Sequence, residues 1–241
     1  MGSNVALITG RGGSSFANKN IRLVKGIPVL GYPAIAVNDS EIFDYKFCSS
    51  DCSAILDCAS EYGFDPILRP EELAQAQSLH VDTIDHALGV ISARGIVVDH
   101  LFVFLANNVC TTSLMITDAM KLLHSTPIAT SVVPVYREYD QHPLRAMKTD
   151  VGGNLMPFLG SNKDEIISSN RQDLTPSYFL CHNFWALSIK NQSTGWSGAF
   201  PWPFLGDYVL PIECGALTDI HCEEDILTSE KWLELNISGK L

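Results

Sequence analysis

A glycine-rich turn near the N-terminus carries residues suited to chemistry with an anion. The stretch VALITGRGGSSFANKN, residues 5–20, is a short apolar run that leads into a glycine pair flanked by two cations. Glycines after a strand let the backbone approach a ligand and present N–H groups to phosphate oxygens. The residues of the turn with this potential are Arg11, Gly12, Gly13, Ser14, Lys19 and Asn20. The turn therefore predicts a binding site for a small anionic molecule.

Two common nucleotide-binding loops are absent. A P-loop needs GxxxxGK[ST], which residues 10–20 do not supply. A dinucleotide-binding turn needs GxGxxG, but Ser15 occupies the third glycine position after Gly10 and Gly12. The chain also lacks the YxxxK pair of short-chain dehydrogenases. A nicotinamide-dependent enzyme is therefore disfavoured.

The distribution of charge also favours an anionic ligand at the turn. The chain has 241 residues and a net charge of −11, yet all 27 acidic residues lie at or beyond Asp39. The charged residues before Asp39 are all cations, namely Arg11, Lys19, Arg22 and Lys25. Binding to a nucleic-acid backbone needs many clustered Lys and Arg residues, so we expect no nucleic-acid partner.

The sequence shows no signal for a membrane or for secretion. No apolar run approaches the ~20 residues that span a bilayer, and the N-terminus lacks the basic flank and cleavage site of a secretory signal. The seven cysteines form no CxxC pair, which suits reduced and mostly structural thiols. We therefore expect a cytoplasmic protein with no membrane partner.

Strand and helix patterns alternate over the first half of the chain. We expect strands at 4–9, 45–50, 67–68, 100–106 and 128–136, and helices at 28–36, 53–62, 81–93 and 112–125. This alternation predicts an α/β fold of three layers, with a mostly parallel sheet between two layers of helices. Ligands in such folds bind beyond the carboxyl ends of the strands, where residues 10–20 emerge.

The pattern changes after about residue 136. DVGGNLMPFLG, residues 150–160, is typical of a hairpin that turns at 152–154, and YFLCHNFWALSI, residues 178–189, is typical of a strand that returns to the sheet. We therefore expect one domain over residues 1–241, with an oligomerisation arm at about 138–182. A final helix is expected to begin near Glu223.

The turn and six later segments resemble the acylneuraminate cytidylyltransferases, which activate sialic acid and related sugar acids. The opening ALITGRGGSSFANKN is similar to the family's first loop. The other similar segments are IRLVKGIPVLGYPAIAV (21–37), SSDCSAILDCASEYG (49–63), LRPEELA (68–74), VDTIDHAL (81–88), NRQDLTPSY (170–178) and DIHCEEDI (219–226). The resemblance runs from about residue 4 to 234. It implies a divergent member with a Rossmann-like nucleotidyltransferase fold and a small dimerisation excursion.

The resemblance also implies a reaction. In the family, the anomeric hydroxyl of a 2-keto sugar acid attacks the α-phosphate of CTP, which gives a CMP-sugar and pyrophosphate. Negative charge gathers on the triphosphate, so positioning and electrostatic stabilisation dominate catalysis. The implied partners are CTP, a sugar acid and a second copy of the chain. The implied catalytic residues are Arg11, Lys19, Asp219 and His221; the nucleotide site adds Gly12, Gly13, Ser14, Asn20, Arg69, Asp82 and Asn107; the sugar site has Arg171, Gln172 and Asn183.

A divalent metal is the expected cofactor, Mg²⁺ or Mn²⁺. Asp219 matches a magnesium ligand of the family, and hard oxygen ligands suit that ion. His221 stands where the family has a second Asp, and imidazole is a poor magnesium ligand. Three roles stay open for His221: ligand of a softer metal such as manganese, general base for the sugar hydroxyl, or a structural residue.

Other departures leave the substrates open. Ser15 stands where the family loop usually has Lys, so the cradle has one cation fewer. The family's LQPTSP is replaced by LANNVCTT, so Asn107 and Asn108 are expected to face the nucleoside with an uncertain base preference. Trp185 is expected near the sugar pocket or, more commonly for an aromatic strand, in the core. The alternatives are a transferase for another nucleotide or sugar, and a non-catalytic binding protein.

Overall fold

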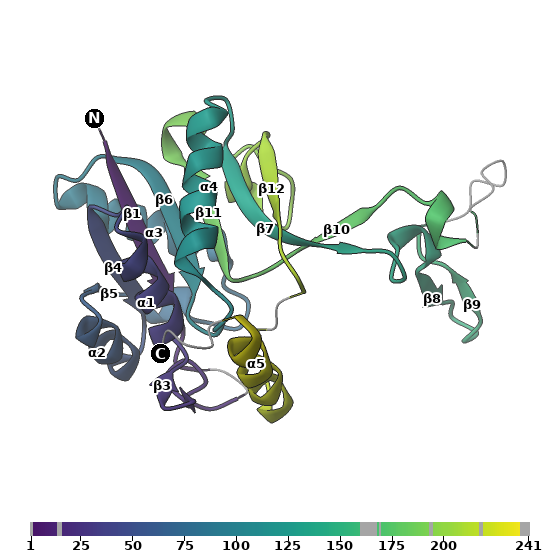
Figure 1. Ribbon diagram of the computed structural model, residues 1–241, viewed down its shortest axis with the longest axis horizontal. Coiled ribbons are helices and arrows are strands. Elements are labelled where there is room, and N and C mark those ends of the chain that lie inside the picture. Colours follow the sequence, from purple (N-terminus) through teal and green to yellow (C-terminus); the bar gives the residue numbers. More distant parts are fainter. Residues whose placement is uncertain are drawn as a thin grey trace.

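An eight-stranded sheet forms the centre of the computed structural model, which describes residues 2–13, 16–159, 168, 170–192, 195–216 and 219–236 (Figure 1). Counted from the edge of the sheet at β5 (Asp65–Leu68), the first four strands run parallel to one another. They are β5, β4 (Tyr45–Ser50), β1 (Ser3–Thr9) and β6 (Val98–Leu105). Antiparallel β11 (Phe184–Ser188) then joins β6 to β7 (Ser131–Glu138), which also pairs with β10 (Ser177–Leu180) and, in parallel, with β12 (Val209–Glu213).

The apolar runs of the sequence explain the central strands. In β1, Val5 pairs with Tyr45 of β4 on one side and Leu101 of β6 on the other. Residues 5–8 of this strand have no exposed surface. A parallel strand covered on both faces needs such a continuous apolar run, since neither face contacts water. The predicted strands at 4–9, 45–50, 67–68, 100–106 and 128–136 are confirmed.

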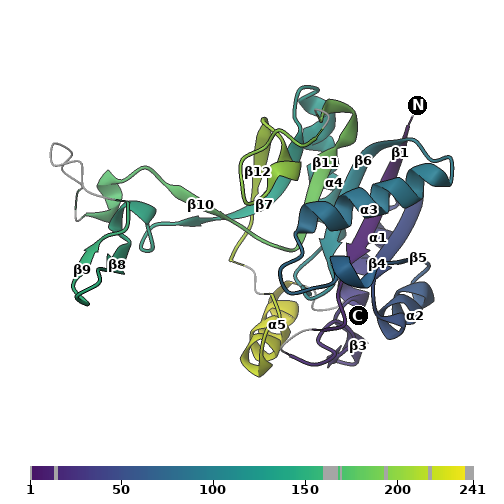
Figure 2. The ribbon, with the colours of Figure 1, turned by 180° about the vertical axis from the view of Figure 1, so that it is seen from behind.

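Helices cover both faces of the sheet (Figures 1 and 2). Ile8 faces a core made with α1 (Gly31–Ser40), α2 (Ser53–Glu61) and α4 (Ser113–Ser125). Its neighbour Leu7 faces the opposite core, which contains α3 (His80–Ala93) and the segment around Phe204. Successive residues of a strand point to opposite faces, so one apolar run supplies both cores. The predicted three-layer α/β fold is confirmed.

The first helix begins later than predicted. We expected a helix over 28–36 that opens at Pro28, but Pro28 belongs to a small hairpin of β2 (Leu23–Val24) and β3 (Ile27–Pro28). Lys25 (φ 46°) and Gly26 (φ 84°) make its turn in the left-handed region. A two-residue turn with positive φ at both positions suits the twist of paired strands. The helix α1 therefore begins at Gly31, after the hairpin.

The other predicted helices are confirmed within one or two residues. The Thr112 side chain accepts a hydrogen bond from the Met115 N–H (3.2 Å) and so begins α4, in the usual manner of an N-cap. The last helix, α5, spans Glu223–Asn236. Short 3₁₀ turns lie at 71–73, 143–145, 171–173, 189–191 and 203–205. In the described part of the chain, no helix has the length and apolarity needed to cross a membrane.

An arm leaves the sheet after β7 and returns through β10 (Figures 1 and 2). It carries the hairpin of β8 (Met147–Thr149) and β9 (Leu155–Pro157), which confirms the hairpin expected in this segment. At its turn, Oδ1 of Asp150 accepts hydrogen bonds from the N–H groups of Gly152 (2.8 Å) and Asn154 (2.9 Å). The hairpin lies away from the helical layers. An oligomerisation role for the arm stays a prediction.

The C-terminal helix packs against the N-terminal hairpin. Ile226 and Leu233 of α5 lie in one apolar cluster with Val24, Val29 and Tyr32. Two ion pairs at the surface join the same segments, Arg22 with Glu223 (2.8 Å) and Lys25 with Glu234 (2.7 Å). Exposed ion pairs contribute little to stability, so the apolar contact dominates this interface. It holds α5 beside the N-terminal hairpin.

A buried histidine makes the stability depend on pH. His100, on β6, lies with Nδ1 2.9 Å from Oδ1 of Asn4. Burial lowers the pKa of His100 to about 4; Lys190 and His124 lower it too, and Asp99 opposes them. In the unfolded chain a histidine has its ordinary pKa of about 6.5. Between these values only the unfolded state binds the proton, so folding stability falls as the pH drops from 6.5 toward 4.

We expect His100→Gln to remove much of this acid sensitivity. Urea titration at several pH values measures the free energy of unfolding. Between pH 6.5 and 4 this free energy should fall in both proteins, and its fall should be smaller in the variant by about 1–3 kcal/mol. His124→Gln is the matched control, because His124 is exposed next to His100 and the variant keeps the buried imidazole. An equal pH dependence in His100→Gln and the original chain would contradict the assignment.

Candidate active site

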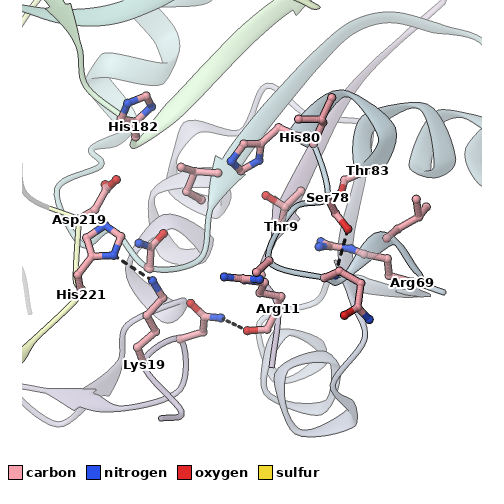
Figure 3. Close-up of a pocket in the computed structure, with 18 of the residues that line it drawn as sticks. Thr9, Arg11, Lys19, Arg69, Ser78, His80, Thr83, His182, Asp219 and His221 are labelled. Atoms are coloured by element: carbon pink, nitrogen blue, oxygen red, sulfur yellow. Dashed lines mark hydrogen bonds between the residues drawn. The ribbon is translucent and has the colours of Figure 1, made fainter. Parts of the chain in front are cut away.

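A cavity of about 490 Å³ opens at the carboxyl edge of the parallel strands (Figure 3). Thr9 and Leu105 line it from the ends of β1 and β6, and Arg69 lines it directly after β5. This is the edge at which α/β sheets bind their ligands. The other polar or charged side chains in its wall are Arg11, Lys19, Asn20, Gln75, Ser78, His80, Thr83, Asn107, His182, Asp219 and His221.

The glycines of the turn let it pack closely. A Cβ on Gly10 would lie 2.8 Å from Cβ of Ala106, and a Cβ on Gly12 would lie 2.9 Å from Cβ of Cys52. Such distances are too short for carbon atoms in contact. Close packing against the neighbouring strand ends therefore requires glycine at both positions.

The backbone amides of the turn are not all directed at the cavity. The Gly12 N–H donates a hydrogen bond to Oδ1 of Asp51 (3.0 Å), the residue that follows β4. Around Gly13, which is exposed, a Cβ would meet no atom within 4 Å. Ser14 and Ser15 lie outside the described residues. Asp51 therefore fixes the turn through Gly12, and the open side of the turn lies at Gly13.

Asn20 fixes the loop that carries Arg11. The Asn20 side-chain amide donates to the Arg11 carbonyl oxygen (3.0 Å), and the Asn20 backbone carbonyl oxygen accepts from the Leu30 N–H (2.9 Å). The Asn20 side chain is almost fully buried. The predicted binding residue Asn20 thus lines the cavity while its amide holds the backbone of the turn.

Lys19 extends its ammonium group toward the C-terminal segment. Its Nζ lies 3.5 Å from Nδ1 of His221, the contact drawn as a dashed line in Figure 3. Burial lowers the pKa of Lys19; the nearby Arg11 also lowers it, whereas Asp219 raises it. The ammonium group thus lies between a guanidinium and a carboxylate at one end of the cavity.

Arg69 contributes a buried cation. Its Nη2 donates to the Ser49 carbonyl oxygen (2.8 Å) and its Nε to the Ser49 hydroxyl (3.3 Å). Burial lowers the pKa of Arg69, the charge of Asp51 raises it, and the nearby Arg11 lowers it. Among the described residues, no acidic side chain lies within 4.0 Å of Arg69. A buried cation without a close counter-ion favours an anionic ligand in the cavity.

Asn108 orients the carboxylate of Asp219. Its Nδ2 donates to Oδ1 of Asp219 (2.8 Å), and its own Oδ1 accepts from the Cys110 N–H (2.7 Å). Asn108 is fully buried, so it supports Asp219 from behind and does not face a nucleoside as we expected. Burial raises the pKa of Asp219, whereas the Asn108 hydrogen bond, His182, His221 and Lys19 lower it.

The segment around His221 is held from both sides. Before it, the Ile220 N–H donates to the Asn107 carbonyl oxygen (2.8 Å) at the end of β6. After it, Oδ2 of Asp225 accepts from the N–H groups of His221 (2.7 Å) and Cys222 (3.0 Å). These bonds satisfy amides at the start of α5, as in a capping box. His221 is therefore positioned by backbone contacts, with its ring toward Lys19.

Two histidines and a tryptophan also line the cavity. The His182 ring lies 5.6 Å from the Trp202 ring, and the rings of His80 and His182 lie 5.1 and 6.1 Å from that of Trp185. Trp185 itself is fully buried in the core. The sequence pattern indicated no role for His80 or Trp202, because neither belongs to a recognisable spacing. Only the fold brings them to the cavity.

The part of the chain that contains the turn and the first parallel strands matches a known family. Residues 5–100 match the cytidylyltransferase family model. The chain is also similar to individual cytidylyltransferases. One is the N-acylneuraminate cytidylyltransferase of Escherichia coli, 36% identical over 87 residues, which are 36% of this chain and 21% of the relative. Another is the pseudaminic acid cytidylyltransferase of Campylobacter jejuni, 29% identical over 100 residues, 41% of this chain and 43% of the relative.

The chain thus spans about a fifth of the first relative's length and less than half of the second's. Solved structures extend the similarity of the fold to the whole chain. CMP:2-keto-3-deoxy-manno-octonic acid synthetase complexed with CTP has a TM-score of 0.68 at 9% identity, and covers 96% of this chain and 98% of its own. 4-Diphosphocytidyl-2C-methyl-D-erythritol synthase of Anaerococcus prevotii has a TM-score of 0.61 at 14% identity, with 97% and 99% covered. The chain therefore has the Rossmann-like fold of these nucleotidyltransferases.

Several residues expected from the cytidylyltransferase resemblance lie elsewhere. Asp82 is exposed on α3 and does not line the cavity, whereas Thr83 does, because neighbouring positions of a helix face different directions. Asn183 is fully buried, with Nδ2 bonded to the Cys110 carbonyl oxygen (3.2 Å). Arg171 and Gln172 belong to the 3₁₀ turn at 171–173 on the arm, and Gln172 does not line the cavity of its own chain.

The donor set fits a metal that binds together with a nucleotide. In the described part of the chain, no three His, Cys, Asp or Glu side chains form a group that could hold a metal ion. Asp219 offers one carboxylate, and one oxygen of this carboxylate accepts a hydrogen bond from Asn108. Magnesium at such sites commonly takes one or two carboxylates and completes its coordination with phosphates and water. Asp219, with nucleotide phosphates, therefore fits this mode of binding.

Proposed function

We propose that this protein transfers CMP from CTP to a sialic-acid-like 2-keto sugar acid and releases pyrophosphate. The observation that carries the proposal is a row of cations, Arg11, Lys19 and Arg69, along the cavity of a chain whose first part matches the cytidylyltransferases (Figure 3). Electrostatic effects link Arg11 to both of the other cations. Three cations in one half-buried site suit a triphosphate, which carries several negative charges.

The chemistry follows from where charge develops. The anomeric hydroxyl oxygen of the sugar acid attacks the α-phosphorus of CTP, and the bond from that phosphorus to the bridging oxygen breaks. Pyrophosphate leaves with the electron pair, so its negative charge grows during the step. In the proposal, Arg11 and Lys19 stabilise this charge, and Arg69 holds the phosphates from the floor of the cavity. The imidazole of a histidine in the cavity takes the hydroxyl proton.

A divalent metal, Mg²⁺ or Mn²⁺, is part of the proposal. Bound to the phosphates, it would neutralise charge on them. Asp219 is its proposed first ligand and His221 its second, but the contact of His221 with Lys19 supports a competing role as a hydrogen-bond acceptor. We expect His221→Asp to raise the ratio of magnesium- to manganese-supported activity severalfold, because a carboxylate is a harder ligand. An unchanged ratio would remove the metal role and leave the roles of general base and structural residue for His221.

In the proposal, the sugar acid binds in the part of the cavity that His182 and Trp202 line. We further propose a homodimer in which Arg171 and Gln172 of the arm reach the sugar site of the second copy. The hairpin of the arm exposes Met147 (50%), Leu155 (70%) and Phe158 (56%), apolar surface that a partner would cover. A monomer in sedimentation measurements would contradict the homodimer. The proposed location is the cytoplasm, which the reduced cysteines suit.

Pyrophosphate release tests the proposed reaction. The purified protein is incubated with CTP, Mg²⁺ or Mn²⁺, and a panel of eight- and nine-carbon 2-keto sugar acids; ATP, GTP and UTP replace CTP in matched reactions. We expect pyrophosphate only with CTP and one class of sugar acid, together with a CMP-sugar detected by mass spectrometry. Turnover with another nucleotide or sugar would support the alternative transferase. CTP binding without turnover under any condition would support a non-catalytic protein.

A further inference from the structure

Two cysteines meet beside the strand that leads into the arm. Sγ of Cys181 lies 3.2 Å from Sγ of Cys214, although the two residues are 33 positions apart in the sequence. A disulfide bond needs about 2.05 Å between its sulfurs, so the two atoms must approach by about 1 Å. Both cysteines are reduced in the structure.

Backbone hydrogen bonds to β7 hold both cysteines in place. The Cys181 N–H donates to the Pro134 carbonyl oxygen (2.8 Å), and the Cys214 N–H donates to the Val135 carbonyl oxygen (2.8 Å). Cys181 directly follows β10, and Cys214 directly follows β12. The sulfurs therefore meet where two strands that pair with β7 both end.

The two chain segments continue into the cavity. Cys181 precedes His182, and Cys214 lies five positions before Asp219. A covalent bond between the sulfurs would therefore constrain the segments that carry His182 and Asp219. Since the sulfurs must move closer to bond, the constraint would shift these segments relative to their reduced arrangement.

We propose that Cys181 and Cys214 form a reversible disulfide when the protein meets hydrogen peroxide, and that this bond slows turnover at the adjacent cavity. In the first step the Cys214 sulfur attacks one peroxide oxygen, the O–O bond breaks and water leaves. In the second step the Cys181 sulfur attacks the Cys214 sulfur, the S–O bond breaks and a second water leaves. Two thiols and one peroxide thus give one disulfide and two waters.

The surroundings of the pair set the order of these steps. Cys214 is partly exposed, so a small oxidant reaches it, whereas Cys181 is 2% exposed. The hydrogen bond with Cys181 lowers the pKa of Cys214, while burial opposes this effect. Thiolate is the nucleophilic form, so the lowered pKa favours attack by Cys214. The buried Cys181 then resolves the oxidised sulfur, since it is the thiol in contact with it.

Mass spectrometry tests the disulfide without reference to activity. The full chain is treated with hydrogen peroxide, unreacted thiols are alkylated, and the protein is digested without reduction. We expect one cross-linked peptide pair that joins Cys181 to Cys214 and disappears after reduction by dithiothreitol. Alkylation of both cysteines after treatment, or their oxidation to sulfinic acid without a cross-link, would overturn the proposal.

Matched serine variants identify the pair. Cys181→Ser and Cys214→Ser should each abolish the cross-link, whereas Cys222→Ser should keep it. Cys222 is the suitable control because it is exposed and its thiol contacts Asp225, away from the pair. A cross-link that involves Cys222 in the original chain would contradict the assignment.

The effect on turnover rests on the proposed function, so it has a separate readout. We expect peroxide to lower CTP-dependent pyrophosphate release by about fivefold or more and reduction to restore it. Neither effect should occur in Cys181→Ser or Cys214→Ser. A complete cross-link with unchanged pyrophosphate release would overturn the coupling to the site. A protein without activity before oxidation would refute the proposed function, while the cross-link would still be measured by mass.

Discussion

Replacement of Lys19 by methionine should lower the rate of pyrophosphate release from CTP by about 100- to 1000-fold. The ammonium group lies in the cavity wall between Arg11 and Asp219, where burial lowers its pKa and water screens it incompletely. Methionine keeps most of the apolar stem and removes the charge. The loss should appear mainly in kcat, because the negative charge on the leaving pyrophosphate increases during the reaction. Initial rates over a range of CTP concentrations measure this.

A second lysine provides the control for charge. Lys121 lies on the outer surface of α4, where its ammonium pairs with Asp118 (2.8 Å). Lys121→Met changes the net charge equally and should leave kcat within about twofold, since a surface ion pair contributes little. Equal rates in Lys19→Met and Lys121→Met would show that the ammonium group of Lys19 has no part in catalysis.

Replacement of Asp219 by asparagine should lower the same rate by about 100-fold or more. Asparagine has almost the same shape and its oxygen still accepts the hydrogen bond from Asn108, so the fold should be retained. What is lost is the negative charge to which the proposal assigns metal binding. We expect activity to respond to added Mg²⁺ only at much higher concentrations. Initial rates across a metal titration give both quantities.

The pH profile separates the charge of Asp219 from its shape. Burial raises the pKa of this carboxyl group, so its active, ionised form is lost at a higher pH than for an exposed Asp. The original protein should therefore lose activity as the pH falls, and the residual activity of Asp219→Asn should lack this acidic limb. Asp118→Asn, at the surface of α4, should retain the limb. A limb that persists in Asp219→Asn would assign it to another group.

Local patterns predicted most of the sheet. Residues 5–8 form a continuous apolar run, and such runs indicate strands that are covered on both faces. The helix α1 was misplaced because proline at position 28 suits the first turn of a helix as well as a hairpin. The strand β12 was missed because Pro211 argues against a strand. An edge strand tolerates proline, and in the described sheet β12 pairs only with β7.

The site was predictable where its residues are close in sequence. Arg11 and Lys19 follow one strand, and both line the cavity. His80 and Trp202 come from separate segments, so only the three-dimensional fold shows that they share a wall with Asp219. Asn108 has the polar character of a ligand contact, but its amide is used inside the protein. Sequence pattern does not distinguish a side chain that binds a ligand from one that supports its neighbour.

The cavity joins the first and last parts of the chain, as the contact between Lys19 and His221 spans 202 positions. A ribosome makes the chain from its N-terminus, so the cationic turn emerges long before the carboxylate that faces it. The helix that packs against the N-terminal hairpin is made later still. The proposed nucleotide site therefore becomes complete only after the segment that carries Asp219 and His221 has been made and has reached Lys19.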